Sequence, residues 1–557
     1  MAATAPVRAP ALSPRFPRPR LRALPALALA GLVAAPLVAV LLRAGGDAAI
    51  WHHLAATVLP AYVGNSLLLV LGVGLLSGVI GSGCAWLVAM YRFPGRELSA
   101  WALFLPLSMP AYVLAYAYTD LLDVTGPVQT AIRAVTGWSV RDFALPEIRS
   151  LPGAVFVLSL ALYPYVYALA RAAFLEQSQC ALEVSRTLGC SGFGAFQRVG
   201  LPLARPAIVA GLSFVAMETL ADFGAVGFFG VPTFTTGIYR AWFGLGSPEA
   251  AAQLSSVLLA AVGLVLLAER LLRGQARFAA RTVHIYRRNP PRLRGIRAVA
   301  AGAACLLPWL LGFALPALAL IAMALERRDA PGPDRLLELL ANTLTVGAVA
   351  AVVIVAVALL ALLTARRAGA LARAALRVAV LGYAVPGAVI GVGLLVTLGA
   401  FDHAVNALTG HRGLLLSGTL AALVYGYLVR FFAVAYNPLE AGVARIAPHM
   451  GEAARTLGHG PLASFARVHL PLLRPHLLGA LLLVLVDVMK ELPATLVLRP
   501  FDFDTLAVET WRLATTERLA GAAVPSLLIV AAGLLPVIVL VRTSERKRRA
   551  LETEEDA

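Results

Sequence analysis

Lysine is almost absent from this chain of 557 residues, although arginine is abundant and the formal net charge is +17. The two lysines, Lys490 and Lys547, follow a methionine and an arginine. A phosphate-binding loop of the Walker type needs a lysine directly after a glycine. The sequence therefore excludes ATP hydrolysis by such a loop, and we expect the chain to hold no catalytic residue.

Cysteine and charged residues are also scarce. The four cysteines (Cys84, Cys180, Cys190 and Cys305) form no CxxC pair and no spacing with histidine that suits zinc, so no disulfide framework or zinc site is expected. Charged residues make up 14% of the chain, hydrophobic residues 59%, and the mean hydropathy is +0.80. A soluble domain needs about twice this charged fraction. The composition indicates a polytopic protein embedded in a lipid bilayer.

Twelve apolar runs are long enough to cross a hydrocarbon core as helices. The sequence therefore predicts an all-α membrane protein of about twelve transmembrane helices. The predicted spans are about 23–42, 63–90, 98–122, 153–175, 203–228, 252–271, 299–324, 340–364, 374–399, 414–436, 473–497 and 520–541.

Arginine placement predicts the orientation and the domain organisation. The N-terminal tail, the segment between spans 6 and 7 and the C-terminus are all densely basic, which favours the cytoplasmic side. Both termini are therefore expected in the cytoplasm. The arginines cluster in loops between apolar runs, so we expect no nucleic-acid partner.

The predicted organisation is a basic tail (1–22), a first half (23–272), a basic linker (273–298), a second half (299–541) and a C-terminal tail (542–557).

One polar stretch occurs twice. Residues 182–206 read "LEVSRTLGCSGFGAFQRVGLPLARP" and residues 451–475 read "GEAARTLGHGPLASFARVHLPLLRP". At an offset of 269 residues (452 − 183), 13 of the 24 columns from Glu183 to Pro206 are identical without a gap. The copies follow spans 4 and 10, so the two six-span halves are predicted to be parallel.

Each copy has the pattern of two short helices joined by a glycine turn. Gly189 and Gly458 suit the left-handed conformation that ends a helix. The Leu-Pro pairs at Leu201 and Leu470 suit the first turn of the next span, because proline fits there. An ordinary helix–turn–helix connector would explain one copy, but two ungapped copies at equivalent places favour a shared function.

The repeated loop resembles the signature loop of permease subunits of binding-protein-dependent ABC importers. That signature reads Glu-Ala-Ala, three residues, Gly, nine residues, Ile, one residue, Leu-Pro. Both copies keep the glutamate, glycine, leucine and proline, with Val199 and Val468 in place of isoleucine, but the first copy has Val184 and Ser185 in place of the alanines. The residues assigned to ATPase coupling are Glu183, Arg186, Gly189, Leu201 and Pro202, and Glu452, Arg455, Gly458, Leu470 and Pro471.

The resemblance implies a type I ABC importer permease fold, in the inner membrane of a bacterium. It also implies two copies of a separate ABC ATPase subunit docked at the loops, and a periplasmic solute-binding protein. ATP would be bound by the ATPase, with no cofactor on this chain. Segments 217–242 and 486–511 are most similar to fused permeases for ferric iron. Thiamine, polyamine, phosphonate and sulfate remain alternative substrates.

Charged residues within spans 5 and 11 form a candidate translocation pathway. At the 269-residue offset Glu218 corresponds to Asp487, and Asp222 to Glu491, with Lys490 added in the second half. This spacing puts each acidic pair on one helical face. Such groups usually face a water-filled cavity or each other, and oxygen ligands suit a hard cation. Alternatively, the acids lie near the outer span ends, where Lys490 offsets Asp487 and Glu491.

Two other classes of function fit the sequence less well. A secondary transporter of the major-facilitator type also has twelve spans in parallel halves. However, its repeated charged loop lies after spans 2 and 8, whereas here the repeat lies after spans 4 and 10. A membrane-embedded enzyme is disfavoured, because HExxH, GxSxG and clustered Asp/His pairs are absent from the sequence.

Overall fold

The computed structural model describes residues 19–554, with gaps at 47, 143–144, 177–186, 188, 190, 274–290, 327–329, 366–368, 411–412, 445 and 459. Within these residues the regular structure is helical, beside one isolated bridge between Arg92 and Arg292. Eleven of the described helices are long and apolar enough to cross a membrane. A bent pair of helices can supply a twelfth span. The predicted all-α membrane fold is confirmed.

The first half contains six spans joined by short helices. Spans 1 to 6 are α1 (Pro19–Ala44), α3 (Leu59–Met90), the broken segment α4 (Arg96–Ala102), η1 (Leu105–Ser108) and α5 (Ala111–Leu122), then α7 (Leu151–Glu176), α10 (Leu201–Ala221) and α13 (Pro248–Arg273). The short helices are α2 (Ala48–Thr57), α6 (Pro127–Thr136), α9 (Gly192–Ala195), η2 (Phe196–Gly200), α11 (Gly224–Phe228), α12 (Phe234–Tyr239) and η3 (Arg240–Gly244).

The second half repeats this order. Spans 7 to 12 are α14 (Ile296–Trp309) continued through η4 (Leu310–Ala314) into α15 (Leu315–Glu326), α16 (Pro333–Ala365), the broken segment α17 (Ala370–Val380), η5 (Leu381–Ala384) and α18 (Gly387–Thr409), then α19 (Leu420–Ala444), α22 (Leu470–Lys490) and α25 (Leu519–Glu554). The short helices are α20 (Pro448–Thr456), α21 (Pro461–Ser464), η6 (Phe465–His469), α23 (Pro493–Leu498) and α24 (Leu506–Thr515).

Spans 3 and 9 are each broken at a proline, which is Pro110 in the first half and Pro386 in the second. Pro110 precedes α5 and Pro386 precedes α18, and each proline has extended backbone angles after a 3-10 turn. Proline lacks the backbone N–H that a continuous helix would need. The segment Arg96–Ser108 meets the segment Ala111–Thr136, which comprises α5 and α6, at an angle of 96°. The breaks turn irregular backbone toward the protein interior, where other elements can satisfy it.

The first span of each half packs against the other half. α1 contacts α17 and α18 of the second half, and Tyr425 Oη donates a hydrogen bond of 2.7 Å to the backbone oxygen of Leu32. Reciprocally, α14 and α15 contact α4 and α5 of the first half, and Tyr118 Oη donates a 2.7 Å hydrogen bond to Leu311 O. Close helix approach requires glycine here, because a Cβ on Gly393 would lie 2.4 Å from Pro36 O. The halves therefore interlock.

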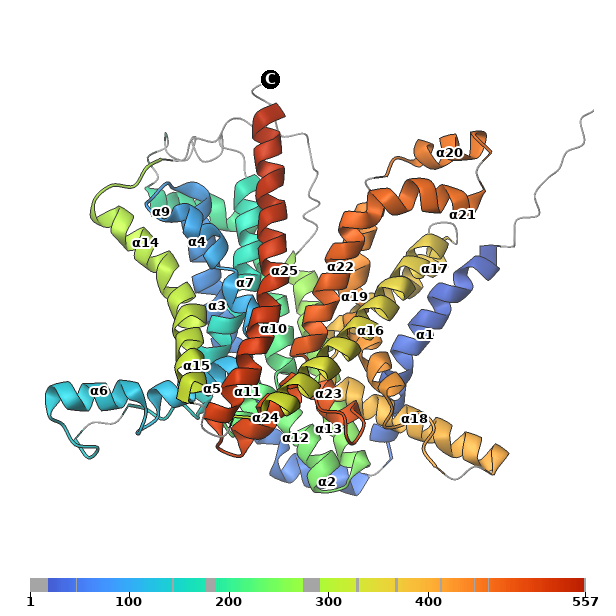
Figure 1. The fold of residues 1–557 in the computed structure, drawn as a ribbon, viewed down its shortest axis with the longest axis horizontal. Helices are drawn as coiled ribbons and strands as arrows, with labels where there is room; N and C mark the ends of the chain where they lie inside the picture. The colour runs from blue at the N-terminus through green and yellow to red at the C-terminus, as the bar shows by residue number, and fades with distance from the viewer. Residues whose placement is uncertain are drawn as a thin grey trace, which may run out of the picture.

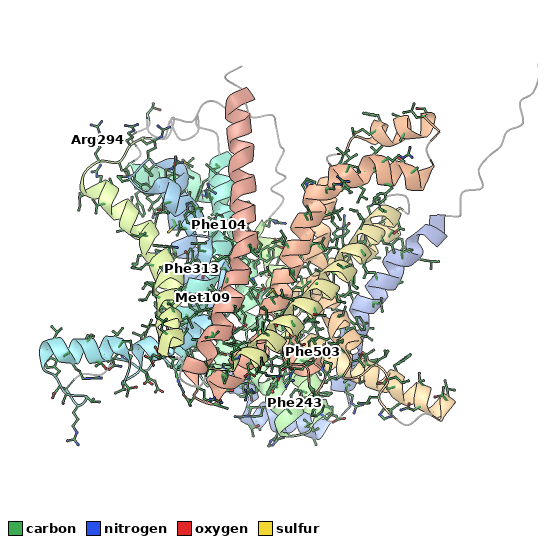
Figure 2. All side chains as sticks on the ribbon, in the orientation of Figure 1. Phe104, Met109, Phe243, Arg294, Phe313 and Phe503 are labelled. Atoms are coloured by element: carbon green, nitrogen blue, oxygen red, sulfur yellow. The ribbon has the colours of Figure 1, made fainter. Side chains whose placement is uncertain are left out.

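The two ends of the helix bundle carry different elements. The repeated loops with α9, α20 and α21 lie at the same end as the C-terminus (Figure 1). In Figure 2, Arg294 lies at this end, whereas Phe243 and Phe503 lie at the opposite end with α2, α12 and α24. The predicted common side for the loops and the C-terminal tail agrees with this arrangement.

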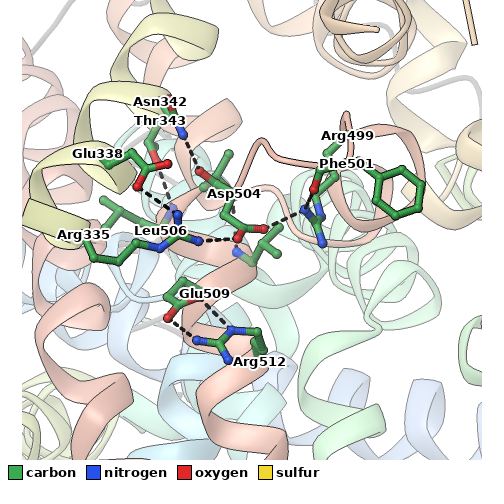
Figure 3. Close-up of polar contacts among 12 residues, drawn as sticks. Arg335, Glu338, Asn342, Thr343, Arg499, Phe501, Asp504, Leu506, Glu509 and Arg512 are labelled. Atoms are coloured by element: carbon green, nitrogen blue, oxygen red, sulfur yellow. Dashed lines mark hydrogen bonds and ion pairs between the residues drawn. The ribbon is translucent and has the colours of Figure 1, made fainter. Parts of the chain in front are cut away.

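A polar network at the end opposite the repeated loops fixes the segment after α23. The Asp504 carboxylate pairs with Arg335 of α16 and lies 2.6 Å from an Arg499 nitrogen (Figure 3). Asn342 Nδ2 donates to Asp504 O at 3.1 Å, and Thr343 Oγ1 accepts from Leu506 N at 2.9 Å. The network therefore joins the start of span 8 to the segment that follows span 11.

Candidate translocation site and coupling loops

Spans 5 and 11 both end directly before an acidic residue. The helix of span 5 ends before Asp222, and that of span 11 ends before Glu491, each in extended backbone. A short helix then begins two residues later, at Gly224 and at Pro493. Glycine and proline are residues at which helices commonly bend or break. The second acid of each pair is therefore the C-cap of the helix that carries the first.

The carboxylates of Asp222 and Glu491 are bound by the backbone of the short helix that follows. Asp222 Oδ1 accepts hydrogen bonds of 3.1 and 2.9 Å from the N–H groups of Ala225 and Val226. Glu491 accepts bonds of 3.0 and 2.9 Å from the N–H groups three and four residues further on. The first N–H groups of a helix lack partners and form its positive end, so a carboxylate is stabilised there. These two acids hold the breaks in place.

A central cavity of about 160 Å³ lies where these breaks meet. Spans 3, 4 and 5 of the first half and spans 9, 10 and 11 of the second half contribute to its walls. Met109, labelled in Figure 2, is part of the wall from span 3. The charged residues of the lining are Glu218, Asp222, Arg430, Asp487, Lys490 and Glu491, with Tyr112, Tyr165 and Tyr383 beside them. All five candidate pathway residues thus line one cavity between the halves.

Glu218 and Asp487 differ from the other two acids because, within the described residues, side chains bind them and backbone N–H groups do not. Tyr383 Oη donates a hydrogen bond of 3.1 Å to Glu218 Oε1, which joins the two halves. Lys490 Nζ lies 3.1 Å from Asp487 Oδ1. The alternative in which Lys490 offsets Asp487 is therefore partly right, but the pair lines the central cavity. Glu491 pairs with a different cation.

That cation is Arg430 of span 10, which the sequence analysis did not select. Its side chain lines the central cavity, the residue is only 9% exposed, and its Nε lies 3.9 Å from Glu491 Oε1. Nη1 donates a 3.4 Å hydrogen bond to Val385 O, whereas Nε has no hydrogen-bond partner among the residues that the structure describes. An arginine inside the apolar run 414–436 was the available signal, because charges at that depth are costly and mark function.

The first repeated loop is packed against the end of span 2. The Trp86 ring lies 5.2 Å from the rings of Phe174 and Phe196, and a Cβ on Gly200 would lie 2.4 Å from Trp86. Gly189 has the positive φ, +79°, that its predicted role requires. Glu183 and Arg186 lie outside the described residues. Leu201 begins α10 with Pro202 in the first turn, as predicted.

The second repeated loop has the same backbone plan. Gly458 follows α20 with φ +81°, and α22 begins at Leu470 with Pro471 in its first turn. Before each span the helix passes through a π-helical turn, at η2 and η6, which are 269 residues apart. The backbone of Glu452 and Arg455 belongs to α20. The coupling residues whose backbone is described therefore occupy equivalent places in the two halves.

No metal-holding group of three His, Cys, Asp or Glu side chains occurs among the residues that the structure describes. The carboxylates of the central cavity are instead bound by backbone N–H groups, a tyrosine or a cation. Such an arrangement suits passing contacts with a cation, since conduction requires weak and multiple sites.

Comparison with known proteins finds one family pattern twice in the chain. The sequence pattern of the family "Binding-protein-dependent transport system inner membrane component" matches residues 77–281 and again residues 354–550. The chain is 26% identical to the Fe(3+)-transport system permease protein FbpB 2 of Haemophilus influenzae, over 86% of this chain and 88% of that protein.

Permease proteins with other named substrates are also similar. The sulfate transport system permease protein CysT of Salmonella typhimurium is 28% identical over 38% of this chain and 74% of that protein. A 2-aminoethylphosphonate transport system permease protein, PhnV, from the same species is 31% identical over 29% of this chain and 57% of that protein. Sequence similarity alone is therefore compatible with several substrates, and the chemistry of the central cavity is needed to distinguish among them.

Proposed function

The chain belongs to the family of binding-protein-dependent transport system inner membrane components, and from that premise we propose that it carries ferric iron inward across the membrane. Family membership makes it the permease component of an ABC importer, with both half-permeases fused in one polypeptide. The relative named for Fe(3+) transport is matched over nearly the full length of both proteins.

The charge of the central cavity is the observation that carries the iron proposal. Its lining has four carboxylates against two cations, a formal excess of two negative charges. Sulfate and phosphonate are anions, and a buried site with excess negative charge repels them. The lining offers carboxylate, hydroxyl and carbonyl oxygens, which are the ligands that a hard cation prefers. A trivalent cation fits this lining better than an oxyanion does.

The coupling loops supply the proposed contact with the motor. A family of binding-protein-dependent importers implies an ATPase partner and a periplasmic binding protein. We assign one ATPase copy to each repeated loop, because the loops are equivalent and lie at the same end of the bundle. The binding protein then docks at the opposite end, beside α2, α12 and α24, and hands its cargo to the central cavity.

Uptake measurements test the cargo directly. In cells whose other iron importers are deleted, radioactive iron should accumulate when this chain is present and not when its gene is removed. Thiamine and sulfate uptake, measured in the same cells, should not depend on the chain. If thiamine or sulfate uptake requires the chain and iron uptake does not, the chain remains an importer permease and the iron proposal fails.

Labelling of single cysteines tests the proposed orientation, with both termini in the cytoplasm. Leu408 at the end of α18 and Leu457 after α20 are 87% and 77% exposed and lie toward opposite ends of the bundle. In a variant whose four native cysteines are replaced by alanine, Leu408→Cys should react with a membrane-impermeant maleimide in intact cells. Leu457→Cys should react only after the membrane is opened, and the reverse pattern would overturn the orientation.

A further inference from the structure

The four carboxylates of the central cavity are not equally available to a cation. Asp222 and Glu491 are occupied by backbone N–H groups of α11 and α23. Glu218 accepts one hydrogen bond from Tyr383. Asp487 is bound by the ammonium group of Lys490, which lies 3.1 Å away. A cation that enters the cavity therefore meets Glu218 directly and meets Asp487 in competition with a lysine.

Lys490 is anchored so that its ammonium group remains beside the cavity. Besides Asp487, Nζ donates to the backbone oxygen of Leu107 at 3.5 Å, in the broken span 3 of the other half. The backbone oxygen of Lys490 accepts a 3.4 Å hydrogen bond from Tyr112 Oη, also of the first half. The Lys490 side chain is 23% exposed, so it is neither free in bulk water nor sealed. It can leave Asp487 and still keep a carbonyl partner.

The two halves differ at this place. At the 269-residue offset, the residue that corresponds to Lys490 is Ala221, which also lines the central cavity. Glu218, which corresponds to Asp487, therefore has no ammonium group one turn away. Lys490 is therefore a positive charge that the second half has and the first half lacks. It lies beside acidic residues that occur in both halves.

We propose that Lys490 is the resident counter-ion of Asp487, which an incoming cation displaces, and that it sets how tightly the cavity holds its cargo. This inference rests on the proposed function. Attraction to a carboxylate and repulsion from an ammonium group both grow in proportion to the charge of the cation. A trivalent ion between Glu218 and Asp487 would be held too strongly to leave without an opposing charge. Lys490 supplies it, and returns to Asp487 when the cargo moves on.

Terbium is a suitable probe, because Tb³⁺ is a hard trivalent ion whose luminescence nearby tyrosines excite. Tyr112, Tyr165 and Tyr383 line the cavity. Tb³⁺ titration of the purified full-length chain should show affinity about tenfold or more higher in Lys490→Ala than in the natural protein, since one repelling charge is lost. Lys490→Arg should stay close to the natural affinity. Glu218→Gln with Asp487→Asn should lose the signal, which identifies the cavity as the site.

A double variant separates charge from mere structural support. Lys490→Ala with Asp487→Asn removes one charge of each sign, so its Tb³⁺ affinity should return toward that of the natural protein. If Lys490 only holds the halves together, the double variant will resemble Lys490→Ala. Unchanged Tb³⁺ affinity in Lys490→Ala, or an equally raised affinity in the double variant, overturns the proposal.

Iron measurements distinguish failure of this inference from failure of the iron assignment. Cells with Lys490→Ala should take up radioactive iron more slowly, while the purified variant retains more iron after washing. If iron moves at the natural rate in Lys490→Ala and Tb³⁺ affinity is unchanged, the counter-ion role alone fails. If the natural chain carries no iron but the Tb³⁺ series behaves as expected, the iron assignment fails and the counter-ion role stands.

Discussion

Replacing Gly458 with valine is expected to leave the protein in the membrane and to reduce solute-stimulated ATP hydrolysis roughly tenfold. Gly458 has φ +81° directly after α20. A side chain with a Cβ costs about 1–2 kcal/mol in this left-handed conformation, and a β-branched one is a clear outlier. Relief of that strain would redirect α20, which carries the proposed ATPase contact. ATP hydrolysis in vesicles containing the permease, its ATPase and loaded binding protein measures the effect.

Gly460 provides a matched control two residues further along the same loop. It has no positive φ, and a Cβ added there meets nothing within 4 Å. Gly460→Ala should therefore keep normal stimulation. Gly458→Asn should fall between the two, because asparagine tolerates the left-handed region better than other residues with a side chain. Normal stimulation in Gly458→Val, with the protein correctly inserted, would remove this loop from the proposed coupling surface.

Glu218→Gln combined with Asp487→Asn is expected to slow iron uptake about tenfold or more while the chain still assembles in the membrane. The two substitutions remove the negative charges that side chains, rather than backbone N–H groups, bind in the central cavity. The formal charge of the lining then changes from an excess of two negative charges to balance. A trivalent cation loses its attraction to the cavity, and initial rates of radioactive iron uptake measure that loss.

The other two acids give the contrasting result. In Asp222→Asn and Glu491→Gln an amide replaces a carboxylate that accepts two backbone N–H groups. The amide keeps one oxygen that accepts hydrogen bonds but loses the negative charge that the positive end of the short helix stabilises, which costs about 0.3–1 kcal/mol. These variants should therefore yield less folded protein, seen as a lower thermal midpoint in detergent. If they fold normally and stop iron uptake, whereas the Glu218 and Asp487 variant transports normally, the roles of the acids are reversed.

Local sequence signals predicted much of the fold. Apolar runs located the spans because a helix satisfies its own backbone hydrogen bonds in lipid and needs no distant partner. Gly189, Gly458 and the two Leu-Pro pairs placed the loop turns and span starts, since each acts through its own backbone geometry. The repeat placed the acidic residues in equivalent positions and so at one site between the halves.

The features that the sequence did not predict depend on contacts between segments that are far apart in the chain. Arg430 pairs with Glu491 from a different span, and Tyr383 reaches Glu218 from the other half. The spacing of Asp222 from Glu218 suggested one helical face, but the carboxylate instead binds the N–H groups beyond the break. The spacing of four residues predicts a shared face only for a helix that continues. It carries no information on the tertiary contacts that favour ending the helix before Asp222.

The interlocking of the halves sets an order of events during synthesis. α1 leaves the ribosome before α17, its partner, which begins 326 residues after α1 ends (370 − 44). At about 5–20 residues per second, translation takes roughly 15–65 s to cover that stretch. Until α16, which also contacts α1, begins at Pro333, α1 has only lipid and the first half as neighbours, so its helix must persist without its final partners. The packing around α1 is therefore completed only after α17 and α18 of the second half have been made.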